Sequence, residues 1–351
     1  MKEKIDKAVL IWLLSGCFLI ATMVIIGGIT RLTHSGLSMV EWKLIMGSIP
    51  PLNEQEWTEI FEKYQQTPEF KIKHNHFTLS EFKSIFFWEY FHRMIGRFIG
   101  IVFIVPFLYF LFQKRLSKSM FQKLLIVLGM GAFQGFLGWF MVKSGLVNRP
   151  DVSHYRLAAH LVTALILYSY TFWLALEVVF ERSFSLPKSF TSLQKILAVF
   201  VIILFLQITY GAFVAGLKAG LFYPTFPKMG NSWIPIAVSF GFQDNGFMSL
   251  FENIATVQFI HRYTAKILLV LVIVLWVKSR NLDLPSRLKF GINGLAITVM
   301  IQFLSGVLTL LFKIPVSLGV FHQFGAIVLL TFSIFAIYQL KGEPEKVLQN
   351  N

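Results

Sequence analysis

Eight apolar runs, each about as long as a bilayer is thick, decide what this chain can fold into. They cover residues 9–28, 85–112, 124–142, 153–180, 193–217, 254–277, 290–312 and 316–340. A helix of about 20 apolar residues crosses the hydrocarbon core, because each residue adds about 1.5 Å along the axis. Only helices and closed barrels satisfy every backbone hydrogen bond there. The predicted fold class is therefore all-α integral membrane, with eight transmembrane helices.

The composition agrees with a membrane protein. The chain is 55% hydrophobic and only 14% charged, whereas about a quarter of the residues in a soluble protein are charged. Its net charge of +14 comes from lysines and arginines in the segments between apolar runs. This placement is typical of membrane topology, so we expect no nucleic-acid partner. The single cysteine, Cys17, lies in the first run, which excludes an internal disulfide and a thiolate metal site.

Lysine and arginine gather on one side of the predicted membrane. The dense segments are the amino terminus, 114–123, 181–195, 278–289 and Lys341. With eight crossings they all face the same compartment, which the positive-inside rule identifies as the cytoplasm. No cleavable signal or transit peptide is evident, which favours a bacterial chain. We expect a multi-pass protein of the cell's inner (plasma) membrane with both termini cytoplasmic. The two long polar loops, after the first and fifth helices, should then face outward.

The two halves of the chain resemble each other. The matches are Gly27 with Gly211, Ser35-Gly36-Leu37 with Ala219-Gly220-Leu221, Gln134 and Gly138 with Gln302 and Gly306, His92-Arg93 with His261-Arg262, and His160 with His322. Four helices per half make the repeat parallel, because an even number of crossings restores the chain direction. We expect two pseudo-repeated four-helix bundles, residues 1–182 and 183–351.

Four histidines lie in the predicted membrane helices: His92, His160, His261 and His322. Each lies within about eight residues of the start of an even-numbered helix, so all four should sit near the outer surface. A lone membrane histidine is more often a hydrogen-bonding residue than a ligand, but four at matched positions favour ligation. Two axial imidazoles from facing bundle helices suit a haem. A zinc or di-iron centre is poorly supported, since no cysteine or carboxylate cluster accompanies the histidines.

Basic side chains accompany these histidines. Arg93 and Arg262, together with Arg31 and Arg156, are placed to meet haem propionates. The alternative is that they only anchor the helices at the membrane interface.

The other histidines receive structural interpretations. His34, His74 and His76 fall in the first outer loop, where we expect His74 and His76 to be solvated. His154 is too far from His160 in sequence to share its helix face, so we expect it at the interface.

Glu89 breaks the symmetry between the halves. It lies one turn before His92, and its repeat mate is the neutral Gln258. An ionisable group in a membrane helix costs roughly 2.5–3.5 kcal/mol, which marks it as a functional-site candidate. A carboxylate there can take part in proton transfer. Alternatively, it accepts a hydrogen bond from a ring nitrogen or pairs with an arginine. The asymmetry indicates that the amino-terminal half does chemistry while the other half holds a permanent cofactor.

At these residues the chain resembles the haem A synthase family over nearly its whole length. The motifs are Gly27-Gly28-Ile29-Thr30-Arg31-Leu32-Thr33, Ser35-Gly36-Leu37-Ser38, Gly47 with Pro50-Pro51, Glu89-Tyr90-Phe91-His92-Arg93, Gln134-Gly135-Phe136-Leu137-Gly138-Trp139, Lys143-Ser144-Gly145-Leu146, His154-Tyr155-Arg156-Leu157-Ala158-Ala159-His160, Gly211-Ala212-Phe213-Val214-Ala215-Gly216-Leu217, His261-Arg262 and His322-Gln323.

The resemblance implies an oxidoreductase that converts the C8 methyl of haem O into the formyl group of haem A, for cytochrome oxidase. Two hydroxylations would be followed by loss of water from a geminal diol. His261 and His322 would hold a resident haem b, and His92 and His160 would flank the substrate haem. Glu89 would lie beside the reacting centre, as a proton acceptor or as a stabiliser of a cationic intermediate.

Partners also follow from the resemblance: a haem O synthase that hands over the substrate, and cytochrome oxidase assembly factors. The sequence does not identify the electron acceptor. Unlike some bacterial members, this chain has no cysteine pair in its outer loops, which excludes a redox relay through thiols. It also reads Tyr223-Pro224-Thr225 where the family often has Asn followed by Thr, so we expect a local change in that loop.

Two alternatives remain open. The first is a di-haem membrane cytochrome b, an electron carrier with two permanent haems and a structural Glu89. The second is a haem chaperone or transporter, although matched sites near one face do not suggest a path across the bilayer.

Overall fold

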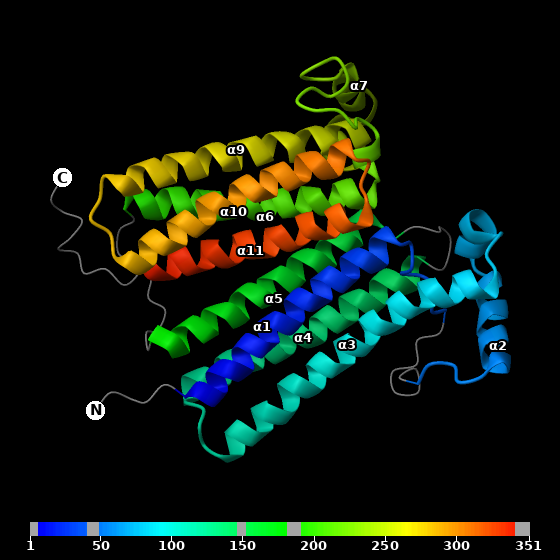
Figure 1. Ribbon diagram of the computed structural model, residues 1–351, viewed down its shortest axis with the longest axis horizontal. Helices are drawn as coiled ribbons and strands as arrows, with labels where there is room; N and C mark the ends of the chain where they lie inside the picture. The colour runs from blue at the N-terminus through cyan, green and yellow to red at the C-terminus, as the bar shows by residue number, and fades with distance from the viewer. Residues whose placement is uncertain (1–5, 41–48, 146–151, 181–190, 341–351) are drawn as a thin grey trace. The chain divides into compact units, whose positions relative to one another are not determined.

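The computed structural model of the protein describes residues 6–40, 49–145, 152–180 and 191–340. Gly47, Leu146, most of the 181–195 linker and Lys341, all used in the sequence predictions, lie outside these ranges. The described residues are predominantly helical and contain no β-strand (Figure 1). The predicted all-α class is therefore confirmed.

Eight helices in the described residues are long and apolar enough to cross a membrane. They are α1 (Lys7–Leu32), α3 (Leu79–Phe112), α4 (Lys118–Gly145), α5 (His154–Phe180), α6 (Ser192–Gly216), α9 (Ile254–Arg280), α10 (Ser286–Leu311) and α11 (Val316–Leu340). Large apolar side chains along them, such as Phe18, Phe112 and Ile202, are exposed. This pattern is that of helices facing lipid rather than water. The chain is a multi-pass membrane protein.

The second of these membrane helices, α3, begins at Leu79, well before the predicted residue 85. Thr78 and Glu81 form a capping box there, because the Thr78 hydroxyl accepts the Glu81 N–H and the Glu81 carboxylate accepts the Thr78 N–H. His92 therefore lies about three and a half turns into its helix. The expectation that each ligand histidine follows its helix start within about eight residues is wrong for this one.

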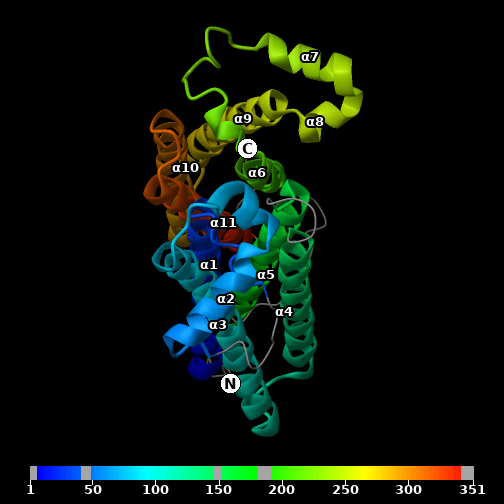
Figure 2. The ribbon, with the colours of Figure 1, turned by 90° about the vertical axis from the view of Figure 1, so that its right-hand side faces the viewer.

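The long polar loops also contain short helices. The first loop holds α2 (Glu54–Gln65) and the π-helix η2 (Phe70–His74). The second holds the 3₁₀ turn η3 (Ala219–Leu221), α7 (Ile236–Asn245), the 3₁₀ turn η4 (Gly246–Met248) and α8 (Ser249–Glu252). Figures 1 and 2 show α7 beyond the end of the bundle where α6 ends and α9 begins.

The chain divides into two compact units, residues 15–167 and residues 1–14 with 168–351. In the second unit α6, α9, α10 and α11 run side by side (Figure 1). The last part of α5 joins them, because the Tyr168 and Thr331 hydroxyls lie 2.7 Å apart and the Trp173 ring packs 5.0 Å from that of Tyr338. This division concerns contacts only, so the predicted functional halves at 1–182 and 183–351 stay a prediction.

An aromatic cap covers the start of α3 in the first unit. Its buried cluster comprises Met39, Tyr64, Phe82, Ile85 and Phe86, with α2 lying against α3 (Figure 1). The Tyr64 side chain is fully buried and stacks on Phe82 with ring centroids 5.0 Å apart. These contacts give the first long loop a hydrophobic core of its own.

His74 belongs to this cap, so the expectation that it is solvated is wrong. Its Nδ1 lies 2.7 Å from the Tyr64 hydroxyl, and its ring stacks on Phe77 at 4.1 Å. The Tyr64 hydroxyl also donates to the Glu69 carboxylate at 3.2 Å. Burial lowers the pKa of His74 to about 4, and burial together with Glu69 raises the pKa of Tyr64. His76, by contrast, is exposed.

Candidate functional site

Each of the four ligand candidates packs its imidazole against a glycine on the preceding membrane helix. A Cβ added at these glycines would lie 3.3 Å from His92 Nε2 at Gly27, 3.2 Å from His160 Cε1 at Gly138, 3.1 Å from His261 Cε1 at Gly211 and 2.7 Å from His322 Cε1 at Gly306. Any larger residue would push against the ring. The same contact thus recurs at all four sites, at the positions that the sequence repeat pairs.

The histidines form one pair in each compact unit. His92 and His160 belong to residues 15–167, whereas His261 and His322 belong to the other unit. The two imidazoles of each pair lie close enough to interact electrostatically. Each pair comes from two different helices, as two axial ligands on facing sides of a flat cofactor would.

On α5, His160 is held by a glutamine of α4. The amide nitrogen Nε2 of Gln134 donates to the His160 carbonyl oxygen at 2.9 Å and lies 3.1 Å from its Nδ1. Because an amide N–H₂ group is only a donor, Nδ1 is the acceptor and the ring proton sits on Nε2.

On α9, His261 has the opposite arrangement. Its Nδ1 lies 3.2 Å from the backbone carbonyl oxygen of Gln207, which can only accept. Nδ1 therefore carries the ring proton and Nε2 keeps its lone pair. The Gln207 amide Nε2 lies 3.5 Å from His261 Nε2, and the Thr264 hydroxyl donates to the Gln207 side-chain oxygen. His261 Nε2, which does not carry the ring proton, is thus the nitrogen that could ligate a metal in place of this weak contact.

On α11, His322 shares features of both. The Gln302 amide donates to the His322 carbonyl oxygen at 2.8 Å, as Gln134 does for His160. The Ser305 hydroxyl lies 2.9 Å from His322 Nδ1 and donates its own proton to the Gln302 carbonyl oxygen at 2.9 Å. With its one proton on that carbonyl, the Ser305 hydroxyl can accept the Nδ1–H of His322. The Nε2 lone pair is again available.

Glu89 is buried and held by several donors. One carboxylate oxygen accepts from Arg93 Nη2 at 2.5 Å. The other accepts from the Ser38 hydroxyl and from the Met39 backbone N–H, both at 2.8 Å. Arg93 Nη2 also donates to the Met39 carbonyl oxygen at 3.1 Å. The sequence placed Glu89 and Arg93 one turn apart, but it gave no sign of the clasp on residues 38 and 39.

The matched position in the other half makes the same connection with reversed polarity. The Gln258 amide Nε2 donates to the Tyr223 carbonyl oxygen at 3.1 Å. Extending the repeat alignment by two residues pairs Tyr223 with Met39. In both halves this helix position is therefore tied to the same loop position, through a carboxylate in one half and an amide in the other.

Arg262 ties the second long loop to α9. Its Nη2 donates to the carbonyl oxygens of Thr225, Pro227 and Lys228, at 2.7, 3.2 and 3.1 Å. Its Nη1 is buried without a hydrogen-bond partner among the described residues, and so is the Gln258 side-chain oxygen. Buried polar atoms of this kind call for a partner that the protein does not supply.

The remaining predicted residues take supporting positions. The Arg156 guanidinium lies over the Phe140 ring at 4.4 Å, a cation–π contact. His154 is buried at the start of α5, with its ring 4.0 Å from that of Tyr155. His34 follows the end of α1 with a left-handed backbone, φ 54°. Within the described residues, no three histidine, cysteine or carboxylate side chains converge as around a zinc or di-iron centre.

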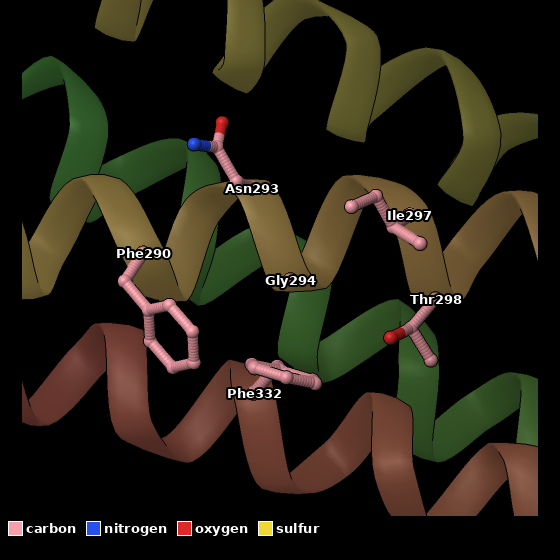
Figure 3. Close-up of a pocket in the computed structure, with 6 residues that line it drawn as sticks. All are labelled: Phe290, Asn293, Gly294, Ile297, Thr298 and Phe332. Carbon is pink, nitrogen blue, oxygen red and sulfur yellow. The ribbon is translucent and has the colours of Figure 1, made fainter.

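A cavity of about 270 Å³ lies away from the histidines, between α10 and α11. Figure 3 shows its lining side chains, Phe290, Asn293, Gly294, Ile297, Thr298 and Phe332. They lie towards the start of α10 and the end of α11, whereas His322 is near the start of α11. This cavity has no titratable or metal-ligating lining residue, so it is not the chemical site.

The fold and the site define a multi-pass membrane protein with one partly buried histidine pair in each of two units. Comparisons with known proteins identify the family of this chain. The family model described as "Cytochrome oxidase assembly protein" matches residues 10–334. The chain belongs to this family, which we identify here with the haem A synthase family on the strength of the relatives described next.

Curated relatives match nearly end to end. The "Heme A synthase" of Flavobacterium psychrophilum is 48% identical over 338 residues, covering 96% of this chain and 99% of the relative. That of Flavobacterium johnsoniae is 46% identical over 341 residues, with the same coverage. That of Nitrosospira multiformis is 42% identical over 343 residues, covering 97% and 96%. The family resemblance found in the sequence is therefore confirmed.

Proposed function

We propose that this chain is a haem A synthase, a membrane oxidoreductase that converts the C8 methyl of haem O into the formyl group of haem A. Family membership supports the activity. One structural observation supports the assignment of roles. Glu89 is buried one helical turn from His92, whereas the matched position beside His261 holds the neutral Gln258. A site for chemistry and a site for a permanent cofactor are thereby distinguished.

We assign the resident cofactor, haem b, to His261 and His322. Both imidazoles carry their proton on Nδ1, towards Gln207 and Ser305, which leaves Nε2 for an iron. At Gly211 and Gly306 the imidazole rings occupy the space that a side chain on the facing helix would need. When bound there, a haem supplies one-electron transfer at a potential set by these ligands.

His92 and His160 flank the substrate haem O in this proposal. Their rings lie against Gly27 and Gly138, in the unit that also contains Glu89. The residues orient the substrate between two helices, and the surrounding apolar side chains keep water out. The C8 methyl would undergo two successive hydroxylations, followed by loss of water.

Glu89 serves as a fixed negative charge beside the reacting carbon. Both of its oxygens accept hydrogen bonds, from Arg93 on one side and from Ser38 and Met39 on the other. Its surroundings therefore favour a stabiliser of developing positive charge over a mobile proton acceptor.

Arg262 and Arg93 donate hydrogen bonds to different acceptors. Arg262 keeps a buried Nη1 without a partner among the described residues, which suits a haem propionate. Arg93 spends one amino group on Glu89 and the Met39 carbonyl. We assign propionate binding to Arg262, and to Arg93 a role that also includes holding Glu89.

The location and partners complete the proposal. The protein would lie in the cell's inner (plasma) membrane with both termini cytoplasmic, as the distribution of basic residues indicates. A phosphatase that is active only outside the cytoplasm should be inactive when fused to the carboxyl terminus; an active fusion would reverse the orientation. A haem O synthase, cytochrome oxidase assembly factors and an electron acceptor are the expected partners.

The test is haem extraction and chromatography from cells that make this protein together with a haem O synthase. Wild type should yield haem A, and Glu89→Ala should leave haem O. Glu89→Gln separates shape from charge, because it keeps the side-chain volume but removes the negative charge. Gln258→Ala is the matched loss of a loop hydrogen bond in the other half, and it should yield more haem A than Glu89→Ala.

Other outcomes would point elsewhere. If haem A forms equally well with Glu89→Ala, the carboxylate is structural and the asymmetry carries no chemistry. If wild type yields no haem A but co-purifies with two haems b, the protein is a di-haem electron carrier.

A further inference from the structure

His160 and His322, near the starts of α5 and α11, occupy matched positions in the repeat. In the described residues, His322 has a serine hydroxyl beside its Nδ1, whereas His160 has a glutamine amide there. Ser305 is buried on α10, 2.9 Å from His322 Nδ1. Because its proton goes to the Gln302 carbonyl oxygen, this hydroxyl accepts from the imidazole. His322 is thus held by an oxygen acceptor as well as by Gly306 and the Gln302 amide.

The matched position in the amino-terminal half is Leu137. The alignment of Gln134 and Gly138 with Gln302 and Gly306 places Leu137 opposite Ser305. A leucine side chain has no hydrogen-bonding atom, and the Nδ1 of His160 meets the Gln134 amide donor instead. The ring proton of His160 then sits on Nε2, the nitrogen that would have to face an iron.

This difference has a known chemical consequence. An acceptor for the Nδ1–H of a metal-bound histidine fixes its tautomer and makes Nε2 a stronger donor to the metal. Losing such an acceptor typically costs roughly 10- to 100-fold in metal affinity. A histidine whose Nδ1 accepts a hydrogen bond must first move its proton before it can ligate, so it binds more weakly.

We propose that Ser305 is a positioning residue that keeps a haem permanently on His322, and that Leu137 at the matched position leaves the haem on His160 exchangeable. The inference rests on the proposed function, because it explains how one half retains its haem while the other accepts haem O and releases haem A. The two sites would then differ through residues other than the four histidines and Glu89.

The first experiment compares purified wild type with Ser305→Ala, made in cells without a haem O synthase. We expect the variant to lose haem b roughly 10- to 100-fold faster to apomyoglobin, a haem acceptor. The midpoint potential of the haem that remains should rise, because a weaker imidazole donor stabilises ferric iron less. Ser305→Thr, which keeps the hydroxyl, should restore both properties.

Ser333→Ala provides a matched control. Ser333 is also fully buried, on α11, where its hydroxyl donates to the Leu329 carbonyl oxygen rather than to a histidine. This variant should leave haem retention and midpoint potential unchanged. Equal changes in Ser305→Ala and Ser333→Ala would overturn the proposal, since any lost serine would then suffice.

The reciprocal variant Leu137→Ser keeps the idea testable even if Ser305→Ala fails to fold. A hydroxyl at this position can accept from His160 Nδ1 once the Gln134 amide turns away from that nitrogen, so haem bound in the amino-terminal half should be released more slowly to apomyoglobin. An unchanged release rate in Leu137→Ser, or unchanged properties in a folded Ser305→Ala, would overturn the inference while leaving the enzyme assignment standing. Wild-type protein that purifies without haem b would instead overturn the proposed function.

Discussion

At Gly306 the backbone of α10 comes so close to His322 that an added methyl group would lie 2.7 Å from the ring. Gly306→Ala must therefore move the imidazole. We expect the purified variant to retain much less haem than wild type, measured as the Soret absorbance per protein.

Gly131→Ala is the control for that substitution. Gly131 lies on α4 with no other atom within 4 Å of an added Cβ, and alanine is the better helix former by about 1 kcal/mol. Its haem content and melting temperature should match or exceed those of wild type. Haem loss in this variant too would mean that the membrane helices tolerate no added methyl group, whatever its contacts.

Substitutions at Gln258 test whether the surroundings of this position, and not only its side chain, differ from those of Glu89 in the other half. In Gln258→Glu a carboxylate would face the Tyr223 carbonyl oxygen, which the glutamine amide now satisfies. We expect about 1–3 kcal/mol of destabilisation, the cost of leaving a buried acceptor unsatisfied. Thermal unfolding in detergent would measure it, with Gln258→Met as the variant that loses the hydrogen bond without adding charge. Equal stability of Gln258→Glu and wild type would contradict the geometry.

Single residues could be foreseen from the sequence when the repeat marked them. The four histidines and Glu89 stood out because ionisable groups are rare in apolar runs. The donors on Glu89 could not be foreseen, since Ser38 and Met39 lie about 50 residues away. Ser305 gave no signal either, because an isolated serine in a membrane helix is unremarkable until the facing residue is known.

Among the elements, the cap made by α2 and η2 should respond to pH. Burial lowers the pKa of His74 to about 4, below its ordinary value of 6.5. The unfolded segment therefore binds a proton more readily than the folded one, so the cap loses stability as the pH falls from about 6.5 towards 4. Limited proteolysis or hydrogen exchange in residues 54–77 should show faster opening at pH 5 than at pH 7. His74→Gln should open at the same rate at both pH values; a pH response that persists would assign the effect to another group.

The eight membrane helices could be predicted because each satisfies its backbone hydrogen bonds within one apolar run. The short helices were missed, since α2 is polar along much of its length and therefore looked like a loop. A signal was present: the Asn53 side chain accepts the Glu56 N–H, a helix start written as Asn-x-x-Glu. The same reading of Thr78 and Glu81 would have placed the start of α3 correctly.

For the whole molecule, the two histidine pairs should act as independent binding sites. Each pair lies within one compact unit, so His92→Ala should leave the spectrum of the resident haem unchanged, whereas His322→Ala should abolish it. Reduced-minus-oxidised spectra of the two purified variants would show this. Loss of both haems in either variant would mean that the sites fold or bind only together.

The hydrogen bonds at Met39 and Tyr223 run in opposite directions, which makes an exchange of side chains between the two halves unequal. In one half a backbone N–H is held by a carboxylate, and in the other a backbone C=O is held by an amide. A glutamate at position 258 would set two acceptors against each other, whereas a glutamine at position 89 could still accept the Met39 N–H through its side-chain oxygen. The contact with the loop therefore tolerates the exchange of glutamate for glutamine in one half but not the reverse exchange in the other.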